Sequence, residues 1–276
     1  MRPTLRVAAA QDESVPGDVT ANVAAAVSLV GSAAEGGARV VVLPELFLTG
    51  YTPGAWASET CVTVDDPRLE PLRAAARDRS VVVVAGAAVR RSRTGRAQPE
   101  HALSLLVFDV TGAVTAPYDK QHLFDAEREF FAAGDHGATV VVDGWELGLG
   151  ICYDGCFPEH AAQAATHGAL AYLCPSAYFV GSEHRRDLYY AARALDNGIY
   201  VVLSGLTGRC GGYDFSGGSA VYDPEGRTVG RVADEAPATV FADLDVDEVS
   251  RVQAMNPIGR DRLTSLGIRE RLVLGD

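Results

Sequence analysis

The sequence predicts a mixed α/β fold in which helices pack against sheets. Short apolar runs alternate along the 276 residues with amphipathic segments, which is the pattern of packed sheet and helix layers. Turn signals at Thr111-Gly112 and at 224–226 separate neighbouring apolar runs, so we expect sheets that contain hairpins and are not purely parallel. We expect residues 1–276 to form a single domain, with residues from about 253 as a C-terminal tail that packs on a partner subunit.

The individual elements follow from local composition. Helical spacing of apolar residues predicts helices over 19–34, 67–79, 158–167 and 183–197. The polar segment 90–99 predicts a solvated loop. Runs rich in β-branched or apolar residues, bounded by Gly, Pro or Asp, predict strands at 5–10, 39–43, 81–85, 103–110, 139–142, 146–151, 170–173, 200–204, 218–222, 228–232 and 239–244.

The charge balance narrows the function classes. The chain has 24 Lys and Arg against 36 Asp and Glu, a formal charge of −12, and the basic residues are scattered. Nucleic acid and anionic membrane surfaces are therefore poor partners, and a small-molecule substrate is favoured. Gln11, Asp12 and Glu13 interrupt any signal-peptide core, and five cysteines are an odd number, so we expect a cytoplasmic protein with reduced thiols.

Three reactive side chains each follow a predicted strand. Glu45 follows RVVVLP, Lys120 follows TAPYD, and Cys152 follows WELGLGI. Lys120 is the only lysine in the chain, which otherwise uses Arg for every cation. A compact ammonium can approach a developing oxyanion more closely than a guanidinium can. The three residues together would supply a base, an electrophilic stabiliser and a nucleophile.

Cys152 has three competing interpretations, of which the plainest is a buried core thiol, the commonest fate of a free cysteine. It lies at a predicted strand-to-helix turn, where a helix N-terminus and a nearby lysine favour the thiolate. Alternatively, Cys152, Cys156 and His160 recur every four residues and His167 follows, a spacing that suggests metal ligands on a helix. Pro158 interrupts that helix, and CxxC and HExxH patterns are absent, so we predict no metal site.

The segments LPELFLTGY, YDKQHLF and GICYDGCFPE occur in this order, followed by RALDNGIYVV and FSGGSAVYDPEG. Together they resemble the signature blocks of the nitrilase superfamily of carbon–nitrogen hydrolases. The resemblance implies a four-layer αββα sandwich and a homodimer or larger oligomer that acts without metal or organic cofactor. It implies Glu45 as the general base, Lys120 as the oxyanion-binding lysine and Cys152 as the nucleophile.

The same resemblance implies a second glutamate between the lysine and cysteine blocks. The segment AEREFFAAGD offers Glu127 and Glu129, and the spacing to Gly134 favours Glu127. Tyr follows the nucleophile where nitrile-hydrolysing members have Trp, which is similar to the amidase and carbamoylase branches. Cys156 stands where many relatives have Arg, so a cation beside the nucleophile is missing.

We therefore predict hydrolysis of a small amide or N-carbamoyl compound through a thioester. The N–H of Tyr153 would help Lys120 to bind the oxyanion, and Tyr178 would line the substrate pocket. A nitrilase, an acyltransferase in which an amine resolves the thioester, and a non-catalytic scaffold remain alternatives. Arg185 and Arg186 suit either a substrate carboxylate or a solvated helix face, and the second interpretation is favoured.

Overall fold

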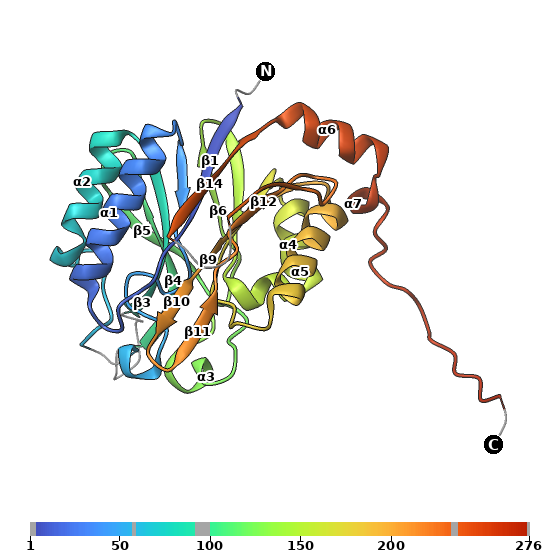
Figure 1. Cartoon of the computed structure of the whole chain (residues 1–276). Helices are drawn as coiled ribbons and strands as arrows, with labels where there is room; N and C mark the ends of the chain where they lie inside the picture. The colour runs from blue at the N-terminus through green and yellow to red at the C-terminus, as the bar shows by residue number, and fades with distance from the viewer. Residues whose placement is uncertain (1–3, 57–58, 92–99, 233–236, 275–276) are drawn as a thin grey trace.

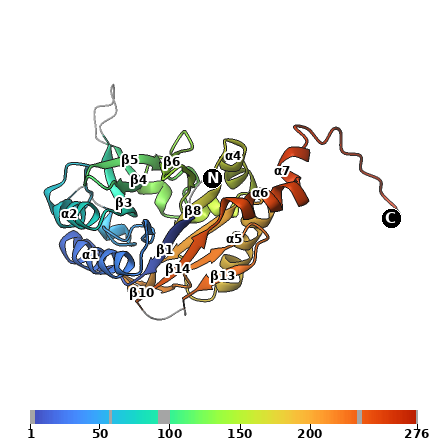
Figure 2. The same cartoon turned by 90° about the horizontal axis from the view of Figure 1, so that it is seen from above.

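The computed structural model describes residues 4–56, 59–91, 100–232 and 237–274. Within these ranges two six-stranded sheets pack face to face, and helices cover the outer face of each (Figures 1 and 2). The layer order is helix, sheet, sheet, helix. The predicted mixed α/β fold and the four-layer sandwich are thereby confirmed.

The first sheet carries α1 (Val19–Glu35) and α2 (Glu70–Arg79) on its outer face. Pro67 opens the short 3-10 turn η2 (Pro67–Leu69) that leads into α2, where its missing N–H is tolerated. The strands of this sheet, in spatial order, are β14 (Ala238–Leu244), β1 (Leu5–Gln11), β2 (Val40–Val42), β3 (Val82–Arg91), β4 (Glu100–Phe108) and β5 (Val114–Asp119).

The second sheet carries α4 (Pro158–Thr166) and α5 (Glu183–Asn197) on its outer face. Its strands, in spatial order, are β13 (Thr228–Arg231), β12 (Ala220–Tyr222), β9 (Tyr200–Gly205), β8 (Ala171–Ser176), β7 (Trp145–Leu149) and β6 (Thr139–Val142). The smaller elements are the hairpin of β10 (Thr207–Cys210) and β11 (Tyr213–Ser216), the turns η1 (Pro53–Ala55) and η3 (Cys152–Cys156), and the helices α3 (Glu127–Phe130), α6 (Val246–Met255) and α7 (Ile258–Asp261).

Strand direction brings the chemically important ends together. Strands β1, β2 and β3 are mutually parallel, as are β7, β8 and β9. Strand β4 is antiparallel to β3, and β5 is antiparallel to β4, so β5 runs in the same direction as β2. Residues that follow β2 and β5 therefore leave the first sheet at the same edge.

All the predicted strands and the four predicted helices are present, and both predicted hairpins are formed, by β4 with β5 and by β12 with β13. Strand β3 continues to Arg91, beyond the predicted end at 85, so residues 90 and 91 of the predicted loop belong to a strand. Residues 92–99 of that loop lie outside the described residues. Helix α6 has no counterpart among the predicted elements.

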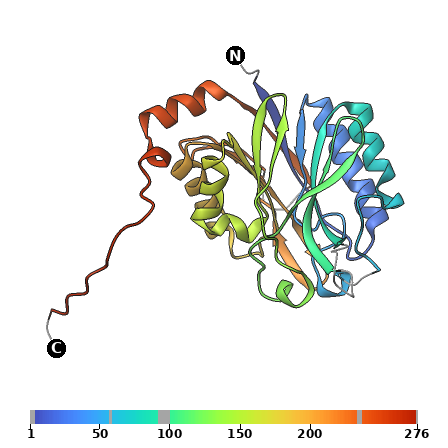
Figure 3. The same ribbon diagram turned by 180° about the vertical axis from the view of Figure 1, so that it is seen from behind.

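The last described segment departs from the body of the protein. After α7, residues 262–274 run away from the sandwich as an extended chain (Figures 1 and 3). Several of its apolar side chains are almost fully exposed, including Leu266, Ile268 and Leu274. Among the described helices, none is both long enough and apolar enough to cross a membrane.

Candidate active site

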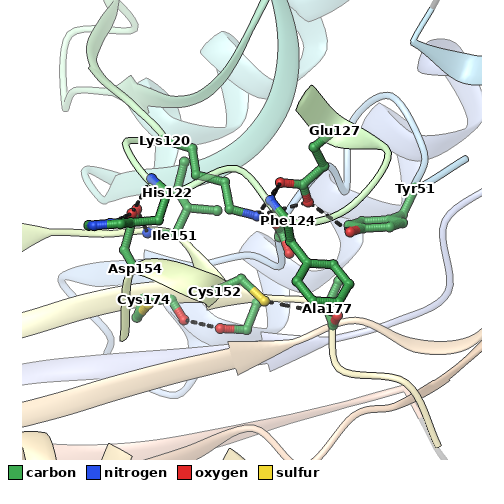
Figure 4. Close-up of polar contacts among 12 residues, drawn as sticks. Tyr51, Lys120, His122, Phe124, Glu127, Ile151, Cys152, Asp154, Cys174 and Ala177 are labelled. Atoms are coloured by element: carbon green, nitrogen blue, oxygen red, sulfur yellow. Dashed lines mark hydrogen bonds and ion pairs between the residues drawn. The ribbon is translucent and has the colours of Figure 1, made fainter. Parts of the chain in front are cut away.

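Glu45, Lys120 and Cys152 come from three separate strand ends and meet at one place in the sandwich, where Figure 4 labels Lys120 and Cys152. Glu45 lies three residues after β2, Lys120 directly follows β5, and Cys152 begins η3, three residues after β7. The two sheets face each other, so residues from β2 and β5 of one sheet reach the residue that follows β7 of the other.

The turn that carries Glu45 packs directly on β3. Gly86 N–H donates to Pro44 O at 3.2 Å, and Leu48 N–H donates to Gly86 O at 3.1 Å. A Cβ at Gly86 would lie 2.7 Å from Glu45 Cα and 2.5 Å from Leu46 N, so only glycine allows this approach. Leu46 adopts a left-handed backbone with φ 51°, which turns the chain sharply after Glu45.

The backbone of Lys120 is fixed in a similar way. Its N–H donates to Leu103 O at 2.8 Å, and its carbonyl accepts from Gly134 N–H at 2.9 Å. A Cβ at Gly134 would lie 2.1 Å from Asp119 O, so glycine is required where this loop crosses the end of β5.

Lys120 lies between two carboxylates. Its Nζ donates to Glu45 Oε1 at 2.6 Å and to Glu127 Oε1 and Oε2 at 2.8 and 2.7 Å. Glu127 also accepts from Tyr51 OH at 2.7 Å and from Phe124 N–H at 2.8 Å. Glu45 and Lys120 are at most 1% exposed, and so is Glu127. Glu127 is thus held by several donors, whereas Glu45 Oε2 has no hydrogen-bond partner among the described residues.

Cys152 has a strained backbone. Its φ of 43° lies in the left-handed region, which a non-glycine residue occupies only when its surroundings impose it. Tyr190 OH donates to Cys152 O at 3.0 Å, and the thiol points toward Ala177 O at 3.9 Å. The side chain is only partly buried and lines a cavity. The strain therefore presents the sulfur at a surface that a small molecule can reach.

Asp154 ties the Cys152 turn to the Lys120 segment. Its Oδ2 accepts from Ile151 N–H at 3.0 Å and from Tyr118 OH at 2.6 Å. Its Oδ1 is 2.9 Å from His122 N and 2.8 Å from His122 Nδ1. Burial raises the pKa of the Asp154 carboxyl, but these hydrogen bonds and the neighbouring histidines outweigh it and hold the pKa below its usual value. Asp154 is therefore a structural acceptor that joins the two segments.

His122, Asp154 and His160 offer atoms within 4.8 Å of one another, close enough to raise the question of a metal. These atoms are already engaged in hydrogen bonds. The His160 ring lies between two tyrosine hydroxyls, 2.8 Å from Tyr118 OH and 2.9 Å from Tyr172 OH. A metal here would have to displace a complete hydrogen-bond network, so the donor set fits a structural cluster better than a metal site.

Burial and charge set the protonation of the reacting groups. Burial raises the pKa of Glu45 to about 7, although the Lys120 charge opposes the shift. Burial and the Glu45 charge raise the pKa of the Cys152 thiol well above its usual value, and the Lys120 charge lowers it only in part. Burial also disfavours the charged form of Lys120, but Glu45 and Glu127 outweigh it and raise the pKa of the ammonium. At neutral pH the cation is therefore permanent, and the thiol needs a base.

The cavity beside Cys152 has a volume of about 130 Å³ and is mainly aromatic. Tyr153, Tyr178, Phe179 and Phe124 contribute to its wall, as was predicted for Tyr178. The backbone N–H of Tyr153, in the first turn of η3, has no acceptor among the described residues. It is therefore free to bind a negative oxygen formed next to the sulfur.

The structure also locates the other residues that the sequence singled out. Glu129 is exposed, whereas Glu127 is buried against Lys120, so only Glu127 belongs to the cluster. Cys156 lines the cavity with its Sγ 3.4 Å from Tyr178 OH. The prediction of a solvated face was wrong for Arg186, which is buried and donates to Ser216 and to Gly217 O.

Sequence reasoning missed Tyr51 and the role of the Tyr118, His122 and Asp154 contacts. Tyr51 ends the segment LPELFLTGY, and its hydroxyl is the donor that a buried Glu127 requires. The presence of a second buried glutamate was the available signal, because a buried carboxylate needs several donors. The Asp154 contacts join residues more than 30 positions apart, and no local pattern indicates such pairs.

Comparison with known proteins is consistent with this geometry. A family model described as carbon–nitrogen hydrolase matches residues 6–254. Deaminated glutathione amidase of Escherichia coli O157:H7 is 31% identical, with 85% of this chain and 88% of that protein covered. An (R)-stereoselective amidase of a Pseudomonas species is also 31% identical, with 85% of this chain and 84% of that protein covered.

Among solved structures, an amidase from Nesterenkonia sp. AN1 is similar over 95% of this chain and 94% of that chain. The TM-score is 0.80 and the sequence identity is 29%. That structure, of a glutamate-to-glutamine mutant, shows the acetamide moiety of fluoroacetamide added covalently to the active-site cysteine.

Proposed function

The chain belongs to the carbon–nitrogen hydrolase family, and from this premise we propose that it is an amidase with Glu45, Lys120 and Cys152 as its catalytic triad. Its substrates are small linear amides, with N-carbamoyl compounds as the closest alternative. The observation that carries the proposal is a lone buried ammonium held between two buried carboxylates, next to a strained, accessible cysteine.

Acylation begins with proton transfer from the Cys152 thiol to Glu45. A carboxyl whose pKa is about 7 suits this step, because it can both accept and return a proton near neutral pH. Its free oxygen, Oε2, is the atom available to accept. The Cys152 thiolate then attacks the amide carbonyl carbon and forms a tetrahedral intermediate that carries a negative oxygen.

Lys120 and the N–H of Tyr153 stabilise that oxygen. Once Glu45 accepts the thiol proton it becomes neutral, so its attraction for Lys120 weakens and an ammonium N–H is released toward the oxyanion. Glu127 stays paired with Lys120 and keeps the cation in place. Glu45 then transfers its proton to the leaving nitrogen, the carbon–nitrogen bond breaks, and ammonia or an amine departs from a thioester on Cys152.

Deacylation uses the same groups in reverse. Glu45 takes a proton from water, the resulting hydroxide attacks the thioester carbon, and Lys120 again stabilises the oxyanion. The carbon–sulfur bond breaks, and Glu45 returns the proton to the Cys152 sulfur as the carboxylic acid leaves. The net reaction consumes one amide and one water and needs no other reactant.

Ammonia release from acetamide, propionamide and butyramide tests this function. We expect turnover by the wild-type chain and loss of more than about 10³-fold in Cys152→Ala, because the covalent route is removed. Cys61→Ala is the matched control, since that thiol is buried outside the cavity. Equal turnover by wild type and Cys152→Ala would refute the proposal.

The exposed C-terminal segment supports a further part of the proposal, a homodimer or larger homo-oligomer. Residues 262–274 carry apolar side chains that touch little of their own chain, such as Ile268 at 98% exposure. Such a segment is suited to packing on a second copy. Light scattering of the full chain and of a chain ending at residue 261 should show a smaller assembly for the shorter protein.

We also place the protein in the cytoplasm, in keeping with its five free cysteines.

A further inference from the structure

The cavity beside Cys152 contains one charged residue. Arg185 contributes to its wall, and the other residues that line it are aromatic, apolar or uncharged polar. Arg185 is exposed, and within the described ranges it makes no ion pair or hydrogen bond. A cation without an acidic partner at the mouth of a mostly aromatic cavity is available to a ligand.

The next residue, Arg186, is also an arginine, but its guanidinium is fully engaged, so the lack of a partner is particular to Arg185. Arg186 is 1% exposed and is held by Asp187, by Ser216 and by the carbonyl of Gly217. Arg186 therefore has a structural role in fixing α5 against the loop before β12. Arg185 leaves the same helix toward the cavity and has no such role.

A second observation places positive charge on the same side of the cavity. Burial raises the pKa of the Cys156 thiol, but the charges of Lys120, Arg193 and Arg185 each lower it. Arg193 follows Arg186 by seven residues on α5 and is buried like it; its Nη2 lies 3.4 Å from Asp196, and its two other guanidinium nitrogens have no acceptor among the described residues. The wall formed by α5 and η3 is thus electropositive, although the chain as a whole is acidic.

We propose that the substrate carries a carboxylate at the end opposite its amide, and that Arg185 binds this carboxylate and determines specificity. The inference rests on the proposed amidase function and narrows its substrate class. A guanidinium binds a carboxylate through two parallel N–H donors, which fixes the orientation of the substrate as well as adding affinity. The amide group is then directed toward Cys152, which lines the same cavity.

The size of the cavity limits the substrate. A volume of about 130 Å³ is close to that of an engineered cavity of about 150 Å³ that binds benzene, so the substrate has on the order of six to nine non-hydrogen atoms. Succinamate fits this range and carries both groups. Its neutral isostere is 4-methylpentanamide, in which two methyl groups replace the two carboxylate oxygens.

The test compares these two amides in wild type, Arg185→Gln and Arg185→Lys. We expect wild type to prefer succinamate, and we expect Arg185→Gln to lower kcat/KM for succinamate by about tenfold to a hundredfold, mainly through KM. For 4-methylpentanamide the same change should be less than about twofold. Arg185→Lys should keep part of the preference, since it keeps the charge but loses the paired donors.

Arg77→Gln is the matched control, because Arg77 is an exposed arginine on α2 in the opposite helical layer. It should leave both substrates unchanged. Binding to Cys152→Ala gives a readout without turnover, and adding Arg185→Gln to that variant should weaken succinamate by the same factor.

Failure of the carboxylate site and failure of the amidase function give different results. Equal kcat/KM for the two amides in wild type, or an equal loss of both in Arg185→Gln, would overturn the carboxylate site and leave the amidase intact. If neither amide is hydrolysed, the proposed function fails, while binding to Cys152→Ala still decides whether Arg185 recognises a carboxylate.

Discussion

Replacing Glu45 by glutamine isolates the proton acceptor. Glutamine keeps the shape of the side chain and an oxygen that can accept from Lys120 Nζ, now 2.6 Å from Glu45 Oε1. It cannot take a proton from the Cys152 thiol. The substitution therefore leaves the packing of a fully buried position nearly unchanged and removes one chemical property.

The expected loss follows from the protonation of the two groups. Burial and the Glu45 charge keep the Cys152 thiol protonated at neutral pH, so the uncatalysed supply of thiolate is very small. General-base catalysis contributes about 10²–10⁴-fold in enzymes, and we expect kcat/KM of Glu45→Gln to fall by that factor.

The pH profile gives a sharper signature. The active form needs ionised Glu45, whose pKa is about 7, so wild-type kcat/KM should fall about tenfold per pH unit below 7 and level off above it. The kcat/KM of Glu45→Gln should not show this decrease below pH 7. The raised pKa of Glu45 in the folded protein also links its ionisation to the free energy of unfolding. Glu45 stabilises the fold below pH 4.5, where it is neutral, and this contribution is lost as the pH rises through 7 and the buried carboxyl ionises. The stability of Glu45→Gln relative to wild type should therefore increase over that range.

Ammonia release from butyramide between pH 5 and 9, with urea unfolding over the same range, measures both effects. Glu129→Gln is the matched control, since it removes an exposed carboxylate near the cluster. If Glu45→Gln keeps more than a tenth of wild-type activity, or keeps the same acid limb, the assignment of Glu45 as the base is wrong.

Three further predictions concern the frame around the cysteine. Lys120→Met leaves Glu45 and Glu127 buried without a cation. The free energy of unfolding in urea should therefore fall by about 3–5 kcal/mol, and activity should fall at least about a hundredfold. An unchanged free energy of unfolding would contradict the ion cluster. Asp154→Asn should cost about 1–3 kcal/mol at pH 7. Because the folded pKa of Asp154 is lowered, this cost should shrink as pH falls below 3.8, and a cost independent of pH would contradict its ionisation. Gly86→Ala should displace Glu45 and lower kcat, whereas Gly54→Ala, whose Cβ meets nothing within 4 Å, should not; equal effects in the two variants would count against this packing.

The sequence predicted the fold well where the pattern is local. The helix expected over 183–197 has those bounds in the structure, and Gly198 ends it in the left-handed conformation. Strand β3 was expected to end before Gly86, since glycine usually interrupts a strand. It continues because Gly86 is the place where the Glu45 turn lies against it. Helix α6 was missed because only Val249 and Val252 among its residues are buried.

The structure brings together the three residues that the sequence singled out, whereas the residues that hold them in place were less predictable. Glu45, Lys120 and Cys152 each follow a strand in one sequence block, so chain order alone indicated them. Tyr51 and the Asp154 network act through contacts between distant segments, which appear only when the sheets pack. Arg185 and Arg186 are adjacent in sequence, and only the direction in which each side chain leaves α5 distinguishes them. Arg185 lines the cavity, whereas Arg186 is buried and bonded to Ser216.

The central claim is that an acyl group passes through the sulfur of Cys152, and trapping that group tests it most directly. Acid quenching of the wild-type chain during turnover of butyramide should trap a butyryl thioester, which forms when the sulfur displaces ammonia and persists until water attacks it. Peptide mass mapping after acid quenching should find the adduct on Cys152, and Cys152→Ala should show none. An adduct on Cys156 instead, or ammonia release by Cys152→Ala at the wild-type rate, would contradict the account.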